Sequence, residues 1–305
     1  MESTSSFKGA RVLVTGATGF IGSGLCRRLL LEGASVYAAC RQSSGEVASG
    51  VTRISATLEK SKSTHDLVRE VLPDYVFHLA GVTSTARDAL LLLPTFQTNL
   101  VTTVNLLAAL VGGICRRVVL AGSFEERRSE ADVVSSPYAA SKWAASCYGR
   151  MCWDLFRVPF VDARIFMVYG PGQRDFKKLI PYTILSLMQG RAPRISSGAR
   201  QVDWIYVDDV VNGLLALALA PGVEGQSIEL GTGRVTAVKV VVDQLTRLIN
   251  PDLPAVLGGV RDRVHEHVRC ADLVRSTQLT GWRPSVALED GLRRTIDYYL
   301  QTSSV

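Results

Sequence analysis

The 305-residue sequence lacks the long basic runs of nucleic-acid-binding proteins, the apolar runs of membrane proteins and the signal peptide of secreted proteins. Its 34 Lys and Arg residues are scattered in short runs, so the net charge of +6 gives no support for nucleic-acid binding. The longest apolar runs, such as residues 213–221, are shorter than a membrane span, and the Ser-rich N-terminus lacks the apolar core of a signal peptide. We therefore expect a cytoplasmic protein that binds neither membranes nor nucleic acids.

Ligands for metals are also few. The six cysteines form no Cys-x-x-Cys pair and mostly fall within apolar stretches, which predicts reduced thiols in the core. The pair His265 and His267 lacks the further ligands that a metal site needs, and we expect no metal. No repeat or low-complexity segment occurs. The chain is long enough for one large domain or two small ones with a sizeable core.

A glycine-rich turn joins an apolar strand, residues 11–15, to a helix, residues 20–31. Its spacing is Gly-x-x-Gly-x-x-Gly: Gly16 would allow the tight turn, Gly19 the close approach of a pyrophosphate, and Gly22 the packing of the helix on the sheet. Phosphates would bind at the helix N-terminus, where unpaired N–H groups and the dipole favour negative charge. The alternative is an ordinary strand-to-helix loop.

The residues after the next expected strand, 35–40, bear on which dinucleotide binds. NAD-binding proteins commonly have an Asp or Glu there for the adenosine ribose, whereas this sequence continues Arg41-Gln42-Ser43-Ser44. An acid would repel a 2′-phosphate, and an arginine with nearby hydroxyls such as Ser43 would bind one. The sequence therefore favours NADP(H), with NAD(H) possible if Arg41 is a solvated loop residue.

Strands and helices alternate along the first half of the chain. The remaining strands are expected at 51–55, 75–81, 117–121 and 161–166, and helices at 64–71, 94–111 and from 137. This order predicts an α/β fold, a doubly wound parallel sheet with helices on both faces. We expect residues 1–166 to bind a dinucleotide and residues 167–305 to be mainly a smaller substrate-binding region, with about 203–230 returning to the sheet. His78, within an apolar run, is interpreted as a satisfied core histidine.

Polar residues follow the fifth strand. Ser123 and Glu125 would face the crevice at the carboxyl ends of the strands, where ligands of such sheets bind. Ser136 is the expected N-cap of the next helix, in which Tyr138 and Lys142 are four residues apart and share a face. The Lys142 charge should lower the Tyr138 pKa from its usual value of about 10, giving an acid or base usable near neutrality.

These motifs, in this order, resemble the extended short-chain dehydrogenase/reductases, the NAD-dependent epimerase/dehydratase family, over nearly the whole chain. Further matches are His78–Gly81, Asn99, Tyr169–Gly172, Asp203–Val210 and Gly281–Pro284. The resemblance implies a Rossmann-type fold and hydride transfer between a nicotinamide and a sugar carbon. It implies these cofactor-binding residues: Gly16, Thr18, Gly19, Phe20, Ile21, Gly22, Arg41, Ser43, Leu79, Ala80, Gly81, Tyr138 and Lys142.

The resemblance also implies catalytic roles for four residues. Tyr138 would exchange a proton with the sugar oxygen, Ser123 would hydrogen-bond and polarise that oxygen, and Lys142 would hold the nicotinamide ribose. In the 4,6-dehydratases an acid and then a glutamate follow the catalytic Ser or Thr, and here these positions hold Phe124 and Glu125. Glu125 could instead be a solvated acid paired with Arg127 or Arg128.

Without that acid, the pattern resembles NADPH-dependent reductases of nucleotide-linked 4-keto-6-deoxy sugars, enzymes of deoxysugar biosynthesis. The alternative is an NAD-dependent nucleotide-sugar 4-epimerase. A 4,6-dehydratase is less favoured, and so is a cofactor-sensing protein without turnover, because Ser123, Tyr138 and Lys142 are all present.

Three positions depart from the family pattern, two of them in the substrate-binding region. Met167 replaces an asparagine, Val202 replaces a phosphate-binding arginine, and Thr57 stands where an adenine-binding aspartate is usual. Leu179 begins an expected lid over the nucleotide base. The substrate-binding residues that we expect are Thr83, Ser123, Phe124, Arg174, Leu179, Arg200 and Arg263.

Two further expectations concern helices. Asp208 and Asp209 are interpreted as structural, capping the helix at 210–220. The helix after Tyr138 has more apolar residues than one packing face requires, which predicts a homodimer through this helix and the one at 94–111, although a thick core contact is the alternative.

Overall fold

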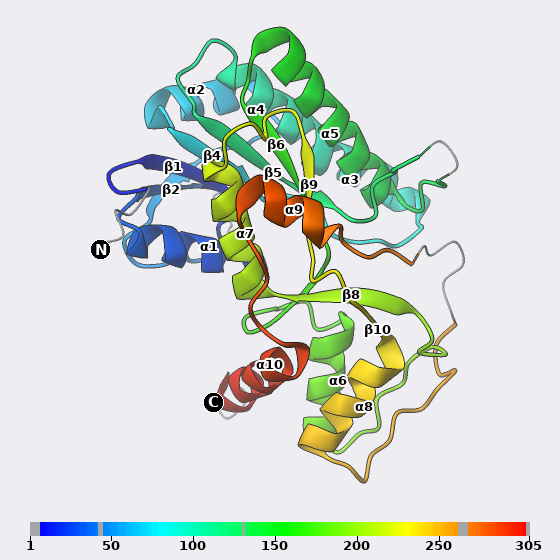
Figure 1. Ribbon diagram of the computed structural model, residues 1–305. Coiled ribbons are helices and arrows are strands. Elements are labelled where there is room, and N and C mark those ends of the chain that lie inside the picture. Colours follow the sequence, from blue (N-terminus) through cyan, green and yellow to red (C-terminus); the bar gives the residue numbers. More distant parts are fainter. Residues whose placement is uncertain (1–6, 42–44, 130–131, 262–267, 303–305) are drawn as a thin grey trace. The chain divides into compact units, whose positions relative to one another are not determined.

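The computed structural model describes residues 7–41, 45–129, 132–261 and 268–302. The chain divides into two compact units (Figure 1). Unit 1 contains residues 1–165, 211–229 and 275–282, and unit 2 contains residues 166–210, 230–274 and 283–305.

Unit 1 is built on a seven-stranded sheet with the order β3-β2-β1-β4-β5-β6-β9. Strands β1 to β6 pair in parallel, and the sequence order reverses at β1, which is the arrangement of a doubly wound sheet. The predicted fold class is confirmed. The strands are β1 Arg11–Thr15, β2 Ser35–Cys40, β3 Thr52–Ser55, β4 Tyr75–His78, β5 Arg117–Ser123, β6 Phe160–Ile165 and β9 Ser227–Leu230.

Helices cover both faces of this sheet (Figure 1). On one face α1 lies beside α7, where the Cβ of a residue replacing Gly24 would be 3.5 Å from Val211. On the other face, Leu106, Leu107 and Phe160 belong to one buried apolar cluster. The helices are α1 Phe20–Leu31, α2 Ser61–Val71, α3 Leu92–Thr95, α4 Thr102–Leu110, α5 Pro137–Phe156, α7 Val207–Leu219 and α9 Leu273–Thr280, with the short η1 Ala89–Leu91 and η2 Phe96–Val101.

The helix predicted at 94–111 is not a uniform α-helix. Its η2 segment is a π-helix, with Asn99 buried in it, and α4 continues from it. Single π-turns inside α-helices often accompany functional sites. The widened turn therefore indicates a functional position at Asn99.

The helical stretch Ala89–Leu110 is long and apolar enough, by length and composition, to cross a membrane, with a mean hydropathy of 1.3. It is longer than the apolar runs on which the sequence-based expectation rested. Core helices of soluble proteins meet the same criterion, and Asn99 and Thr103 of this stretch make buried hydrogen bonds within unit 1.

Unit 2 contains a three-stranded sheet with the order β10-β8-β7 and its own apolar core, which includes Tyr169, Trp204 and Leu245. Asp203 of β8 accepts hydrogen bonds from the backbone of Thr232, Gly233 and Ala271, so it ties two loops to this sheet. The elements are β7 Met167–Tyr169, α6 Leu179–Met188, β8 Gln201–Tyr206, β10 Val235–Ala237, α8 Val238–Ile249 and α10 Leu288–Thr302.

All six cysteines are free thiols. Cys26, Cys40 and Cys152 are buried as expected. The expectation of core thiols is wrong for Cys147 and Cys270, which are exposed. Cys147 is on α5 beside buried Ser146, at a helical position that turns toward solvent.

Candidate active site

The glycine-rich turn packs so closely on its neighbours that Gly16 and Gly22 have no room for a side chain. Gly16 has a φ of +70°, and a Cβ there would lie 2.7 Å from the Ala80 nitrogen. A Cβ on Gly22 would lie 2.1 Å from the Gly16 carbonyl oxygen. Gly19 is the N-cap of α1 and has no side chain that could cap the helix. The first N–H groups of α1 can therefore donate to an anionic ligand at the helix N-terminus. The turn fits a dinucleotide pyrophosphate.

A buried hydrogen-bond network fixes the end of β4 beside this turn. His78 bonds Thr15 through Nδ1 at 2.7 Å and Thr103 through Nε2 at 3.0 Å. Burial, with a contribution from the Lys142 charge, lowers the His78 pKa to about 3, so the imidazole is neutral. Thr15 also accepts the Ala80 N–H. His78 is the satisfied core histidine that its apolar surroundings predict.

Asn99 holds the loop after β4. Its Oδ1 accepts the Val82 N–H at 2.7 Å, and its Nδ2 donates to the Val82 carbonyl and to the Ser141 hydroxyl. Ser141 in turn donates to the Tyr138 carbonyl. The π-turn therefore connects the loop at Gly81 and Thr83 to the first turn of α5.

Ser123, Tyr138 and Lys142 come together at the end of β5. Ser123 is the last residue of β5, and the Ser123 hydroxyl is hydrogen-bonded to the Tyr138 phenol. The Lys142 Nζ donates to the Ala121 carbonyl at 2.7 Å and lies 5.9 Å from the centre of the Tyr138 ring. Ser136 caps α5 as predicted, accepting the Ala139 N–H at 3.1 Å.

The prediction that the Tyr138 pKa is lowered is wrong for the protein without bound cofactor or substrate. Burial raises this pKa above its usual value, and the carboxylates of Glu125, Glu126 and Asp162 raise it further, whereas the bond to Ser123 lowers it. Burial also lowers the Lys142 pKa. Burial of the phenol, to which the neighbouring acids add, therefore decides the direction of the Tyr138 pKa shift, and four-residue spacing alone does not reveal it.

Glu125 and Phe124 follow Ser123 as half-buried residues. The Glu125 N–H donates to the Ser123 hydroxyl at 3.2 Å, and its carboxylate is close enough to act on the Tyr138 pKa. Arg128 pairs with Glu229 at 2.6 Å, and Arg127 lies over the Trp143 ring.

The other expected cofactor residues lie in the same unit. Arg41 directly follows β2, has an exposed side chain, and its carbonyl accepts a hydrogen bond from Arg53. Leu79 and Ala80 are half-buried after β4, and Gly81 and Thr83 are exposed in the loop that Asn99 holds. Thr18, Phe20 and Ile21 line the glycine-rich turn and the start of α1. Ser43 is outside the described residues.

The expected substrate residues of the second half belong to unit 2. Arg174 is exposed, Leu179 begins α6, and Arg200 is half-buried just before β8. Met167 is half-buried in β7 and Val202 is buried in the unit 2 core, so these two departures replace polar groups by apolar contacts. Arg263, His265 and His267 are outside the described residues.

Asp209 has a different structural role from the one expected. It is in the first turn of α7, but its carboxylate accepts hydrogen bonds from the N–H and hydroxyl of Ser285 and the N–H of Val286, at 2.9 to 3.0 Å. It therefore anchors a distant loop instead of serving only as a cap. Glu126 and Asp162, two fully buried carboxyl groups behind Ser123, were not predicted as site residues.

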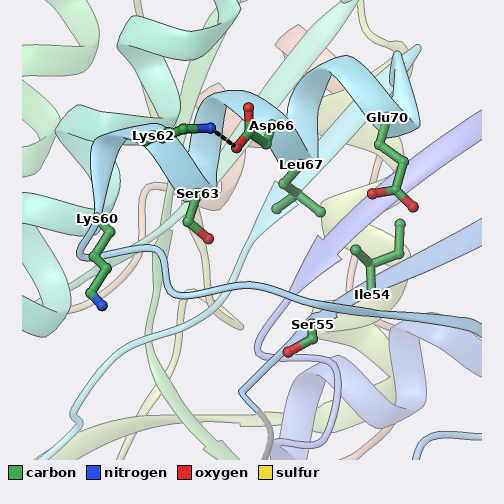
Figure 2. A pocket seen from close by; sticks show the side chains of 8 residues that line it. All are labelled: Ile54, Ser55, Lys60, Lys62, Ser63, Asp66, Leu67 and Glu70. Carbon is green, nitrogen blue, oxygen red and sulfur yellow. Dashed lines mark hydrogen bonds and ion pairs between the residues drawn. The ribbon is translucent and has the colours of Figure 1, made fainter.

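A cavity of about 360 Å³ lies between β3 and α2 (Figure 2). Lys60, Lys62, Ser63 and Asp66 are among its lining residues, and Lys62 pairs with Asp66 at 2.8 Å. It contains none of the predicted catalytic residues. Within the described part of the chain, no group of three or more His, Cys, Asp or Glu could hold a metal ion.

The model of the NAD dependent epimerase/dehydratase family matches residues 12–231. The chain belongs to this family. It is therefore an oxidoreductase-type enzyme of the nucleotide-sugar epimerase/dehydratase group, as the motifs predicted.

Individual members of the family match over different lengths. The UDP-glucose 4-epimerase of Mycolicibacterium smegmatis is 31% identical, covering 96% of this chain and 99% of that protein. The dTDP-D-glucose 4,6-dehydratase of Mus musculus is 30% identical over 59% of this chain and 53% of that protein. The solved structure of MoeE5 in complex with UDP-glucose and NAD has 28% identity and a TM-score of 0.83, covering 96% of this chain and 99% of that chain.

Proposed function

We propose that this enzyme reduces the 4-keto group of a nucleotide-linked 4-keto-6-deoxy sugar with NADPH. The observation that carries the proposal is the end of β2, where exposed Arg41 directly follows Cys40 at the position where an acid would repel a 2′-phosphate. The Ser123, Tyr138 and Lys142 group supplies the proton chemistry that this reduction needs.

In this proposal, residues 16–22 bind the pyrophosphate and Lys142 binds the nicotinamide ribose. NADPH would supply the hydride to C4. The Tyr138 phenol donates a proton to the C4 oxygen, and the Ser123 hydroxyl hydrogen-bonds the same oxygen and polarises it. Glu125 lies beside this pair and would orient the sugar. Thr83, Phe124 and residues of unit 2, including Arg174, Leu179 and Arg200, would bind the nucleotide sugar.

Phe124 argues against a 4,6-dehydratase. Loss of water from the sugar needs an acid that protonates the leaving hydroxyl. The residue directly after Ser123 is apolar, so that donor is missing at the position where dehydratases carry it.

A 4-epimerase that uses NAD is the second candidate. The full-length match to a UDP-glucose 4-epimerase favours it. An epimerase removes and returns the same hydride, so it would use the same Ser123, Tyr138 and Lys142 but would retain its dinucleotide through many turnovers.

The test mixes the purified protein with NADPH and a panel of enzymatically generated nucleotide 4-keto-6-deoxy sugars. Substrate-dependent loss of the reduced-nicotinamide absorbance supports the reductase and identifies its nucleotide. Epimeric sugars from UDP-glucose, with bound NAD and no net change in cofactor, would favour the epimerase. Analysis of the dinucleotide that copurifies gives an independent answer.

We also propose a homodimer through α3, η2 and α5. Large apolar side chains are exposed along these adjoining helices, and burying them against a second copy would remove them from water. Light scattering of the purified protein measures the mass directly. The exposed side chains are Leu92, Leu93, Phe96, Tyr148, Met151 and Leu155.

A further inference from the structure

The turn after β5 is held by Glu126. Its side chain is 0% exposed, and its Oε1 accepts the Ser123 N–H at 2.7 Å. Its own N–H donates to the Ser123 carbonyl at 3.1 Å, and the Glu125 N–H donates to the Ser123 hydroxyl. Glu125 and Glu126 thus fix Ser123 at its amide, its carbonyl and its hydroxyl.

Asp162 of β6 lies against Glu126, across Gly122. A Cβ on Gly122 would be 2.0 Å from the Asp162 Oδ1 and 2.6 Å from the Glu126 Oε1, so both oxygens crowd one point and lie close together. The Arg164 Nε is 3.5 Å from the Glu126 Oε2 and 3.5 Å from the Asp162 Oδ2. Two buried carboxyl groups therefore share this guanidinium.

Two adjacent buried carboxylates repel each other, and leaving water disfavours both charges. Burial and then Asp162 raise the Glu126 pKa to about 8, while Arg164, the Ser123 N–H and Lys142 oppose this. Burial raises the Asp162 pKa as well, opposed by Arg164, by Arg150 of α5 and by the hydroxyls of Ser146 and Ser227. Near neutrality the pair retains a proton.

This pair also acts on the residues that carry the proposed chemistry. Glu126 and Asp162 both raise the Tyr138 pKa and the Lys142 pKa. A phenol that holds its proton more firmly is a weaker acid toward a substrate oxygen. One negative charge on the pair therefore raises the Tyr138 pKa less than two charges would, and leaves the phenol a stronger proton donor.

We propose that Glu126 and Asp162, with Arg164, form a positioning pair that holds the Ser123 turn and keeps one shared proton at neutral pH, so that one negative charge rather than two faces Tyr138. The proposal rests on the proposed function only for the roles of Ser123 and Tyr138. The pair would contact neither cofactor nor substrate and would act through those two residues.

Infrared difference spectroscopy of the whole protein tests the shared proton without any substrate. Wild type should show a protonated-carboxyl band at neutral pH that disappears as the pH rises above about 8. The band should titrate at a lower pH in both Glu126→Gln and Asp162→Asn, because each variant removes one carboxyl group of the pair while Arg164 still favours ionisation of the other. A wild-type spectrum without this band, or a band that titrates at the wild-type pH in both variants, would overturn the proposal.

Kinetics over about pH 6 to pH 10 tests the link to Tyr138. Wild-type kcat should fall as the pair loses its proton, and Glu126→Gln should remove that fall while keeping an oxygen for the Ser123 N–H. Glu126→Leu removes the acceptor and should lower kcat by about tenfold relative to Glu126→Gln at every pH. An unchanged pH profile in Glu126→Gln would contradict the link.

The exposed Glu70→Gln on α2 is the matched control, and it should leave the band and the pH profile as in wild type. Thermal unfolding and NADPH affinity establish that each variant is folded. If no nucleotide sugar is turned over, the proposed function fails, and the infrared result still decides the shared proton.

Discussion

The two units of this chain differ in how closely their residues follow the pattern of the family. In unit 1 the family's features depend on backbone geometry: Gly22 packs against Gly16, and Asn99 holds Val82. In unit 2 two positions that depart from the family pattern, Met167 and Val202, are side chains that have become apolar, in a core that packs around them. Backbone geometry tolerates almost no change, whereas a ligand-contacting side chain can be exchanged when the ligand changes. We therefore expect the reaction type to depend mainly on unit 1 and the choice of substrate mainly on unit 2.

Tyr138→Phe should have the largest effect and would confirm that chemistry belongs to unit 1. The variant keeps the ring but loses the proton, so kcat should fall by about a thousandfold or more, with NADPH affinity nearly unchanged. Steady-state kinetics and dinucleotide titration measure the two quantities. Wild-type turnover in this variant would mean that Tyr138 is not the acid.

Gly22→Ala should come next, because its Cβ would be 2.1 Å from the Gly16 carbonyl oxygen. Moving that turn should weaken NADPH binding by about 2–3 kcal/mol, or roughly a hundredfold. Gly24→Ala is the matched control in the same helix, since its Cβ would make an ordinary 3.5 Å contact with Val211. Equal affinities in the two variants would refute the importance of the turn's shape.

Arg41→Asp tests which dinucleotide unit 1 selects. Replacing the cation by an acid should change the ratio of NADPH to NADH affinity by about tenfold or more in favour of NADH. Fluorescence titration with each reduced dinucleotide gives this ratio. If the ratio stays at its wild-type value, Arg41 does not contact a 2′-phosphate and the epimerase reading gains support.

Arg200→Ala should have the smallest effect and extends the comparison to unit 2. Loss of one charge-assisted contact to a diphosphate should raise the KM for the sugar substrate by several-fold, with little change in kcat. The exposed Arg191→Ala in the same unit serves as control. A fall in kcat without a change in KM would assign Arg200 to the reaction instead of to substrate binding.

The sequence predicted most of the fold because its signals are local. The helix at Phe20–Leu31 and the cap at Ser136 follow from apolar spacing and capping chemistry within a few residues. The same locality explains why Ser123, Tyr138 and Lys142 could be singled out: a strand end and a helix start each carry their own pattern.

The missed features depend on contacts between residues distant in sequence. Asp162 lies in β6 and becomes a neighbour of Glu126 only when β6 pairs with β5. The expected direction of the Tyr138 pKa shift was wrong for the same reason, because burial of the phenol in the fold raises this pKa and these acids raise it further. One signal was available: a carboxylate at the centre of the run from Phe160 to Ile165 is rarely buried without a partner.

The π-turn at Asn99 has a consequence for insertions and deletions. A π-turn contains one residue more than an α-turn, so deleting one residue between Phe96 and Val101 would convert it into ordinary α-helix, with α4 and its apolar contacts preserved. Asn99 would then turn away from Val82 and Ser141. We expect a protein shortened in this way to keep its fold, to lose the contacts that Asn99 makes with Val82 and Ser141, and to be less active.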